Sequence, residues 1–189
     1  MEKETIKKGT DFSAFLNQYQ EMDTKRQEFL TMIGLVAPGT PLRQGINYIV
    51  QAQSGALIII GNIEDKSLFE IGFTEEANYT PHKLYGLAKM DGAIIMDSDI
   101  SIIKYSNTHL HPHTKIASLE TGARHRVAER FAIQTGAIAI AISQKRNTVT
   151  IYFKKNKYIL RILPEIMSAC AQALQTFDNY KNGVKKLMD

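Results

Sequence analysis

The sequence predicts an α/β protein in which helices flank both faces of a mixed, largely buried central sheet. Residues 56–61 and 137–143 are continuous apolar runs, typical of strands that are covered on both sides. Segments with helical spacing of apolar residues alternate with these strands, and short hairpins lie between them. This order of elements favours one sheet between two layers of helices.

The composition is that of an ordinary globular protein. Of its 189 residues, 44% are hydrophobic and 22% are charged, which excludes a wholly disordered chain. The net charge of +4 is compatible with a nucleotide or nucleic-acid partner. Cys170 is the single cysteine, so no disulfide can form within the chain, and its apolar neighbours predict a core position.

Nothing in the sequence predicts a membrane partner. No apolar run approaches the roughly 18 to 20 residues that a bilayer span needs. The charged start, Met1-Glu2-Lys3-Glu4, lacks the apolar core of a signal peptide. We therefore expect a cytoplasmic protein.

Residues 1–33 are expected to be a charged tail followed by an amphipathic helix, and residues 34–189 to be one domain. Apolar residues recur at helical spacing after Asp11, an N-cap residue, and the pattern ends at Gly34. Two interpretations of this apolar stripe stay open: packing on the domain, and assembly or cover of the active face.

In the first half of the domain, capping residues mark the helices and apolar runs mark the strands. Thr40 caps a helix that begins at Pro41, and Thr80 caps another that begins at Pro81. Of four predicted strands, the first two are expected to pair with each other, and the last two to form a hairpin. These strands are residues 56–61, 68–71, 91–96 and 100–105.

The second half of the domain continues this alternation. A helix from Gly122 to about Gln134 stops at Gly136, because glycine suits a left-handed C-cap. Basic turns separate the next three strands, and Pro164 opens a last helix that reaches Lys181 or beyond. The three strands are predicted at residues 137–143, 148–153 and 158–160.

The turn at Thr121-Gly122 leads into a helix whose first turn carries Arg124, His125 and Arg126. A helix N-terminus presents free N–H groups and a partial positive charge, so cations placed there need an anion to compensate them. This arrangement favours a polyphosphate site, and the alternative is a solvated basic turn. The same two alternatives, a phosphate contact or a solvated turn, apply to Ser143 at the end of a buried strand and to Lys145 and Arg146 in the turn after it.

A carboxylate, Asp91, stands where a buried strand begins, and Gly92 follows it. Ligands of α/β folds collect at sheet edges, and a glycine lets a ligand approach the backbone. A carboxylate beside a phosphate site is what metal-assisted phosphoryl or nucleotidyl transfer needs, although Asp-Gly is also a common turn pair. The histidines at 109, 111 and 113 are predicted to lie exposed in a loop and not to bind a metal, because Pro112 interrupts any strand.

Two motifs, Asp91-Gly92-Ala93 and, 33 residues after Asp91, Arg124-His125-Arg126, resemble the paired motifs of the diadenylate cyclase domain family. The sequence is similar above all to the N-terminal domain of the DisA-like members, from about residue 30 to residue 181. This resemblance implies that residues 34–189 form a diadenylate cyclase domain. Flanking stretches are similar too: residues 36–43, 87–90, 141–143 and 146–147.

This resemblance implies an enzyme that condenses two ATP into cyclic di-AMP with release of two pyrophosphates, aided by Mg or Mn. It implies a homodimer whose two domains meet face to face, each holding one ATP; any larger homo-oligomer stays open. Asp91 would bind the metal and help activate the ribose 3′-hydroxyl, and His125 would lie near the metal. The implied catalytic residues are Asp91, Arg124, His125 and Arg126. The implied ATP contacts are Gly92, Ala93, Thr121, Gly122, Arg124, His125, Arg126 and Ser143.

The sequence departs from the family pattern at several points. Val127 stands where a threonine is usual, which removes one hydroxyl contact to phosphate, and Gln144 stands where a charge is common. We expect either an isolated cyclase domain or a fragment, because the sequence ends at Asp189, and we do not expect DNA binding. Two rival functions are a non-catalytic ATP or cyclic-dinucleotide binding module, and a basic nucleic-acid-binding domain with salt-sensitive affinity.

Overall fold

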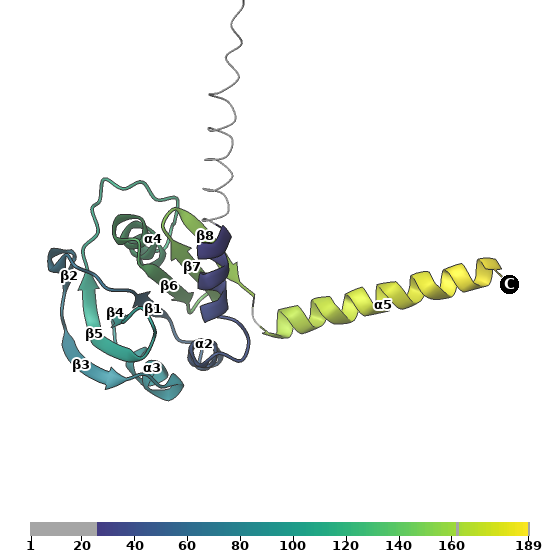
Figure 1. The fold of residues 1–189 in the computed structure, drawn as a ribbon, viewed down its shortest axis with the longest axis horizontal. Coiled ribbons are helices and arrows are strands. Elements are labelled where there is room, and N and C mark those ends of the chain that lie inside the picture. The colour runs from purple at the N-terminus through teal and green to yellow at the C-terminus, as the bar shows by residue number, and fades with distance from the viewer. Residues whose placement is uncertain (1–25, 162, 189) are drawn as a thin grey trace, which may run out of the picture. The chain divides into compact units, whose positions relative to one another are not determined.

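A computed structural model of the protein describes residues 26–161 and 163–188 (Figure 1). Two compact units divide between Arg43 and Gln44. Residues 26–35 are helical, and the predicted part of that helix before residue 26 lies outside the described residues. The other helices are α2 (Pro41–Gln51), the 3₁₀ turn η1 (Lys66–Leu68), α3 (Pro81–Leu87), α4 (Ala123–Thr135) and α5 (Leu163–Met188).

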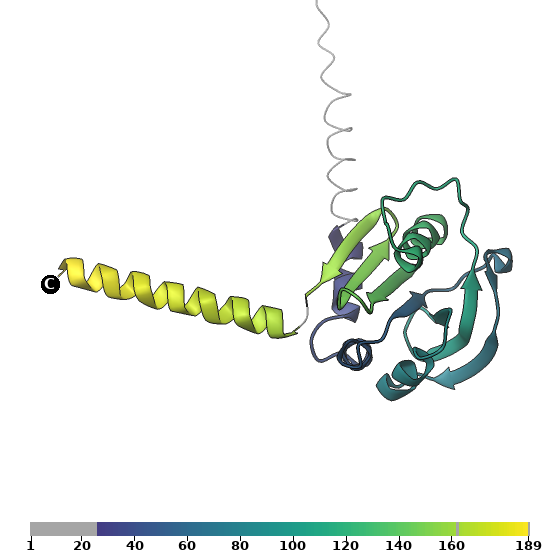
Figure 2. The same ribbon diagram turned by 180° about the vertical axis from the view of Figure 1, so that it is seen from behind.

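The strands form one mixed, eight-stranded sheet (Figure 2). Its strands lie in the order β2-β5-β4-β1-β6-β7-β8, and β3 also pairs with β5. β1 and β4 run parallel, whereas the other pairs are antiparallel. The bounds are β1 (Ala56–Ile60), β2 (Phe69–Glu70), β3 (Phe73–Asn78), β4 (Ala93–Met96), β5 (Ile102–Leu110), β6 (Ile138–Ser143), β7 (Thr148–Phe153) and β8 (Asn156–Leu160).

The central strands are buried on both faces, as the apolar runs predict. All five residues of β1 are buried, and alternate side chains point to opposite faces of the sheet. On one face, Leu57 and Ile59 pack with Ala128 and Phe131 of α4. Figure 1 shows α3 on the other side of the sheet from α4. The predicted mixed sheet with helices on both faces is therefore confirmed.

The capping signals are also confirmed. The Thr80 hydroxyl accepts a hydrogen bond from the Lys83 N–H at 3.1 Å, and the Thr40 hydroxyl accepts one from the Arg43 N–H at 3.2 Å. Gly136 ends α4 in the left-handed conformation with φ of 72°.

Two predictions about the sheet are wrong. Residues 69–70 (β2) pair with β5 and not with β1, because β4 and β6 already occupy both sides of β1. β5 extends to Leu110, so His109 lies in a strand, although its side chain is exposed. β3 was not predicted, since its polar sequence Phe-Thr-Glu-Glu-Ala-Asn carries no apolar run.

Cys170 is exposed, so its predicted place in the core is wrong. Helical spacing on α5 predicts which residues share a side, but it does not predict what covers that side. Met167 and Leu174, on the same helix, are exposed as well. In the part of the chain that the structure describes, no helix combines the length and apolar character needed to span a membrane.

The register of the central strands brings three chain segments to one edge of the sheet. Leu57 is paired with Ala93 and Ala56 with Ile142, so the starts of β1 and β4 and the end of β6 lie together. The polar residues that the sequence singled out stand directly outside these strand ends.

Candidate functional site

The first turn of α4 is open to an anion. Gly122 is its N-cap and provides no side-chain hydrogen bond, and the turn contains no acidic residue. The Gly122 carbonyl accepts the Arg126 N–H at 2.9 Å, which starts the helical ladder. Because the N–H groups before Arg126 have no partner carbonyl inside the helix, the helix tip suits a phosphate group.

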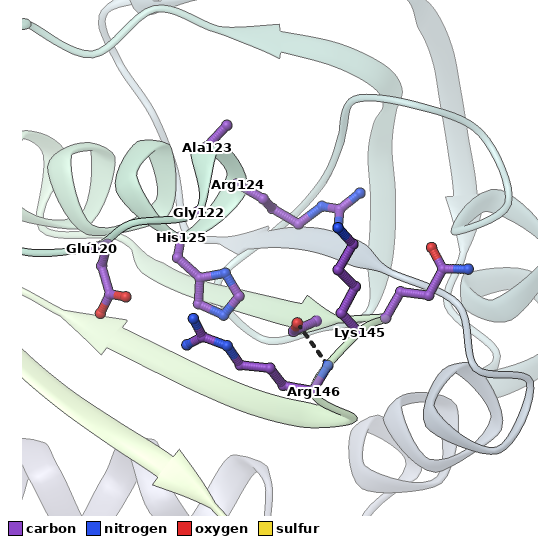
Figure 3. A pocket seen from close by; sticks show the side chains of 9 residues that line it. Glu120, Gly122, Ala123, Arg124, His125, Lys145 and Arg146 are labelled. Atoms are coloured by element: carbon purple, nitrogen blue, oxygen red, sulfur yellow. Dashed lines mark hydrogen bonds between the residues drawn. The ribbon is translucent and has the colours of Figure 1, made fainter.

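A pocket of about 310 Å³ opens at this helix tip (Figure 3). One wall is the start of α4, and the other is the turn between β6 and β7. The lining residues are Glu120, Gly122, Ala123, Arg124, His125, Ser143, Gln144, Lys145 and Arg146. The pocket thus brings together four predicted site residues, Gly122, Arg124, His125 and Ser143. It also contains Lys145 and Arg146, the basic turn that the sequence left open between a phosphate site and a solvated turn.

Gly55, directly before β1, and the Ile142 carbonyl of β6 position Arg124. The guanidinium lies directly over Gly55, where an added Cβ would be only 3.0 Å from the Arg124 Cζ atom. Its Nη1 atom donates to the Ile142 carbonyl at 3.5 Å. Because Gly55 has no side chain, the Arg124 guanidinium has room to reach the edge of the sheet.

Arg146 connects the two walls of the pocket. Its backbone N–H donates to the Ser143 hydroxyl at 3.3 Å, and its guanidinium donates to the Thr121 hydroxyl at 3.5 Å. Thr121 therefore meets the basic turn, although it does not line the pocket itself. These contacts hold the turn against the start of α4.

His125 is partly buried between charged groups. Its ring meets the ring of Tyr152 edge-on, with 6.3 Å between the centroids. Burial lowers the pKa of His125, the Glu120 charge acts to raise it, and nearby cations, among them Arg146, act to lower it further. The imidazole is therefore held mostly neutral near pH 7 in the absence of an anion.

Glu120 is a pocket residue for which the sequence reasoning predicted no role. Its side chain is only 11% exposed and forms an ion pair with Lys157 of β8. Burial acts to raise the pKa of Glu120, but the Lys157 hydrogen bond, the neighbouring Tyr152 hydroxyl and the Lys157 charge together outweigh it, so the pKa lies below its ordinary value. Tyr152, whose pKa is raised by burial and by the Glu120 charge, lies behind this pair. Lys157 is far from Glu120 in the sequence, so no local signal could have predicted the pair.

Arg126 does not line the pocket. Successive helix residues are rotated by about 100°, so Arg124 and Arg126 leave α4 in directions about 200° apart. The Arg126 Nε atom donates to the Glu120 carbonyl at 3.2 Å. Its predicted contact to a phosphate stays a prediction.

Asp91 stands at the same edge of the sheet but outside the pocket. β4 and β6 lie on either side of β1, so about 10 Å, two strand spacings, separates their ends. Gly92 has a φ of 85°, and an added Cβ would be 2.7 Å from the Asn107 backbone, so the neighbouring strand requires this glycine. Ala93 is fully buried in the core. The predicted roles of Asp91 in catalysis and metal binding, and of Gly92 and Ala93 in binding ATP, stay predictions.

The donor set near the pocket suits a metal that is also held by substrate. No three histidine, cysteine, aspartate or glutamate side chains gather into a metal cluster anywhere in residues 26–161 and 163–188, so the three histidines near residue 111 form none. Mg²⁺ commonly takes one or two carboxylates and completes its shell with phosphate oxygens and water. The exposed Asp91 carboxylate fits such a site, with His125 on the other side of β1.

Residues 43–157 match a family model described as "DisA bacterial checkpoint controller nucleotide-binding". A DNA integrity scanning protein DisA from Acetivibrio thermocellus is 48% identical over 158 residues, which are 83% of this chain and 44% of that protein. A DisA from Clostridium tetani is 44% identical over 166 residues, 87% of this chain and 46% of that protein. The chain thus spans less than half the length of these curated relatives.

Solved structures share the fold at lower identity. DacA from Staphylococcus aureus, solved as a double mutant, superposes with a TM-score of 0.54 at 20% identity, over 69% of this chain and 89% of that one. A hypothetical membrane spanning protein from Bacillus cereus superposes with a TM-score of 0.57 at 22% identity, over 65% and 62% of the two chains.

Proposed function

Since this chain belongs to the DisA bacterial checkpoint controller nucleotide-binding family, we propose that it is a diadenylate cyclase. It would condense two ATP into one cyclic di-AMP and two pyrophosphates. The observation that carries this proposal is the cationic pocket at an uncapped helix tip, with a carboxylate, Asp91, at the same sheet edge. ATP is a cytoplasmic substrate, so we expect the protein to act there.

In the proposed reaction, the 3′-oxygen of each ATP attacks the α-phosphorus of the other. A bond forms between the 3′-oxygen and the α-phosphorus, and the bond from that phosphorus to the α,β-bridging oxygen breaks. Pyrophosphate leaves with the electron pair, and the hydroxyl proton passes to Asp91 or to water. Such chemistry needs in-line positioning and charge neutralisation more than covalent help from the protein.

The pocket supplies the neutralisation. Arg124, Lys145 and Arg146 would bind the triphosphate, and the free N–H groups of α4 would add to them. The neutral His125 imidazole can accept or donate a hydrogen bond there. Thr121 and Ser143, already linked to Arg146, would fix the orientation of the bound phosphates.

The position of Asp91 favours a homodimer. One subunit holds its phosphate pocket at the end of β6 and its Asp91 before β4, on opposite sides of β1, and these two strand ends are about 10 Å apart at ordinary strand spacing. A second subunit related by a two-fold axis would bring its Asp91 to the nucleotide in this pocket, and the two-fold symmetry of the product matches that arrangement. An isolated subunit is then inactive.

Mg or Mn would be held by substrate oxygens together with Asp91 and His125, which the dimer brings to one nucleotide from opposite subunits. When bound, the cation would withdraw charge from the phosphates and lower the pKa of the attacking hydroxyl.

The proposal is tested by incubating the purified protein with ATP and Mn²⁺ and separating the nucleotides. We expect cyclic di-AMP from the wild type, and none from Asp91→Asn, which should still bind 3′-deoxy-ATP through the cationic pocket. Tight binding of ATP without any dinucleotide would instead indicate a binding module, and that result would refute the cyclase.

A further inference from the structure

The pocket contains one feature that a site for anions does not need. Glu120 brings a carboxylate into a pocket whose two walls carry the cations Arg124, Lys145 and Arg146, and it is the one acidic residue among the nine that line the pocket. A carboxylate close to bound phosphate is repulsive, so its presence requires a physical account.

The surrounding contacts fix Glu120 firmly. Its N–H donates to the Ser118 hydroxyl at 3.3 Å, and that hydroxyl donates to Glu129 on α4. Its carbonyl accepts from Arg126, and its carboxylate accepts from Lys157 of β8. Both ends of the residue are thus tied to the helix and the sheet that form the pocket.

Glu120 and His125 are neighbours. Figure 3 shows the carboxylate beside the imidazole, with the Arg146 guanidinium also next to the ring. The charge of Glu120 acts on His125, and the edge-on contact with Tyr152, which is 1% exposed, closes the side of the ring away from solvent. Lys157 compensates the carboxylate from outside the pocket lining.

We infer that Glu120 is a positioning residue, which holds the His125 imidazole toward the pocket and limits how tightly the pocket binds polyphosphate. The second effect matters because each turnover releases pyrophosphate, an anion that the same cations would otherwise retain. Binding that is equally strong for substrate and product does not speed turnover. The expected effect on turnover rests on the proposed function. The expected effect on binding does not, because Glu120 would lower the affinity of the pocket for any polyphosphate.

Two single variants test the inference with opposite signs. Glu120→Gln removes the negative charge, so inorganic pyrophosphate should bind about three- to tenfold more tightly in calorimetry, the size expected for one unit charge near a surface pocket. Lys157→Met leaves the carboxylate uncompensated and should weaken pyrophosphate binding. Glu70→Gln, the same change on exposed β2, should leave the affinity unchanged. The differences should shrink with added salt.

The kinetic readout separates positioning from damage. Glu120→Gln should lower kcat by about 10- to 100-fold through the misplaced imidazole, while the KM for ATP falls. A damaged fold would raise KM and lower kcat together and would also lower the melting temperature. Pyrophosphate affinity that is unchanged or weaker in Glu120→Gln overturns the inference. If the wild type forms no dinucleotide, the proposed function fails, but the pyrophosphate measurements still decide the role of Glu120.

Discussion

Replacing Gly55 with alanine should weaken nucleotide binding without unfolding the protein. An added methyl group would overlap the end of the Arg124 side chain, with Cζ at 3.0 Å and Nη2 at 3.2 Å from the new Cβ. The backbone at Gly55 has no positive φ, and no backbone atom is among its three nearest neighbours. The flexible guanidinium is therefore what must move.

The expected magnitudes follow from these contacts. Displacing Arg124 loses its 3.5 Å hydrogen bond to the Ile142 carbonyl, which costs the fold about 0.5–1 kcal/mol. A charge-assisted hydrogen bond to phosphate is worth about 1.5–3 kcal/mol, so affinity for ATP should fall by about tenfold or more. Binding should thus suffer more than stability.

Calorimetry with 3′-deoxy-ATP and denaturant unfolding measure the two effects. Gly86→Ala is the matched control, because an added Cβ there has no neighbour within 4 Å and alanine favours the helix. In an Arg124→Ala background, Gly55→Ala should cause no further loss of affinity, since both changes remove the same contact. A full additional loss in that background, or unaltered affinity in the single variant, would refute the role assigned to Gly55.

Three more predictions concern the stability of the fold. Gly92→Ala should lower the free energy of unfolding by at least about 1–2 kcal/mol, because φ is 85° and the Asn107 backbone occupies the Cβ position; an unchanged urea midpoint would contradict this. Asp97→Ala should cost about 2–3 kcal/mol in urea unfolding, because the carboxylate accepts from the Ser101 and Ile102 N–H groups at 2.9 and 3.1 Å and from the Ser101 hydroxyl; Asp178→Ala, on exposed α5, is the control. Burial lowers the pKa of His125 in the folded protein, so the unfolded chain binds the imidazole proton more tightly. The free energy of unfolding should therefore fall as the pH is lowered from 6.5, the ordinary histidine pKa, toward the lower pKa of the folded state. The variant His125→Gln should lack this part of the pH dependence, and identical pH profiles for the two proteins would argue against it.

Local patterns predicted the elements of the fold better than their pairing. The apolar runs of β1 and β6 and the glycine after α4 are contained in a few adjacent residues, so the sequence alone could reveal them. The partner of β2 depends on which strands already flank β1, which is a property of the whole sheet. β3 was not predicted because it pairs only with β5, at the edge of the sheet, and its sequence is mostly polar.

The candidate site shows the same division. The Arg124-His125-Arg126 triplet predicted a cationic helix tip, and helical geometry could also have predicted that the two arginines diverge. Glu120 and Lys157 meet across 37 residues, so their ion pair depends on how β8 aligns with the loop before α4. Pairs of this kind are visible only in the folded chain.

Because α4 has no side-chain cap, binding of a nucleotide at its first turn should stabilise the folded domain. An aspartate or serine at position 122 would stabilise the first turn by roughly a few tenths of a kcal/mol whether or not a nucleotide is present. With glycine there, and with arginines opposing the helix dipole, the N–H groups of that turn are stabilised when a phosphate from solution binds them. The thermal stability of this domain should therefore rise with the concentration of nucleotide, and the empty protein should fray first at its own binding site.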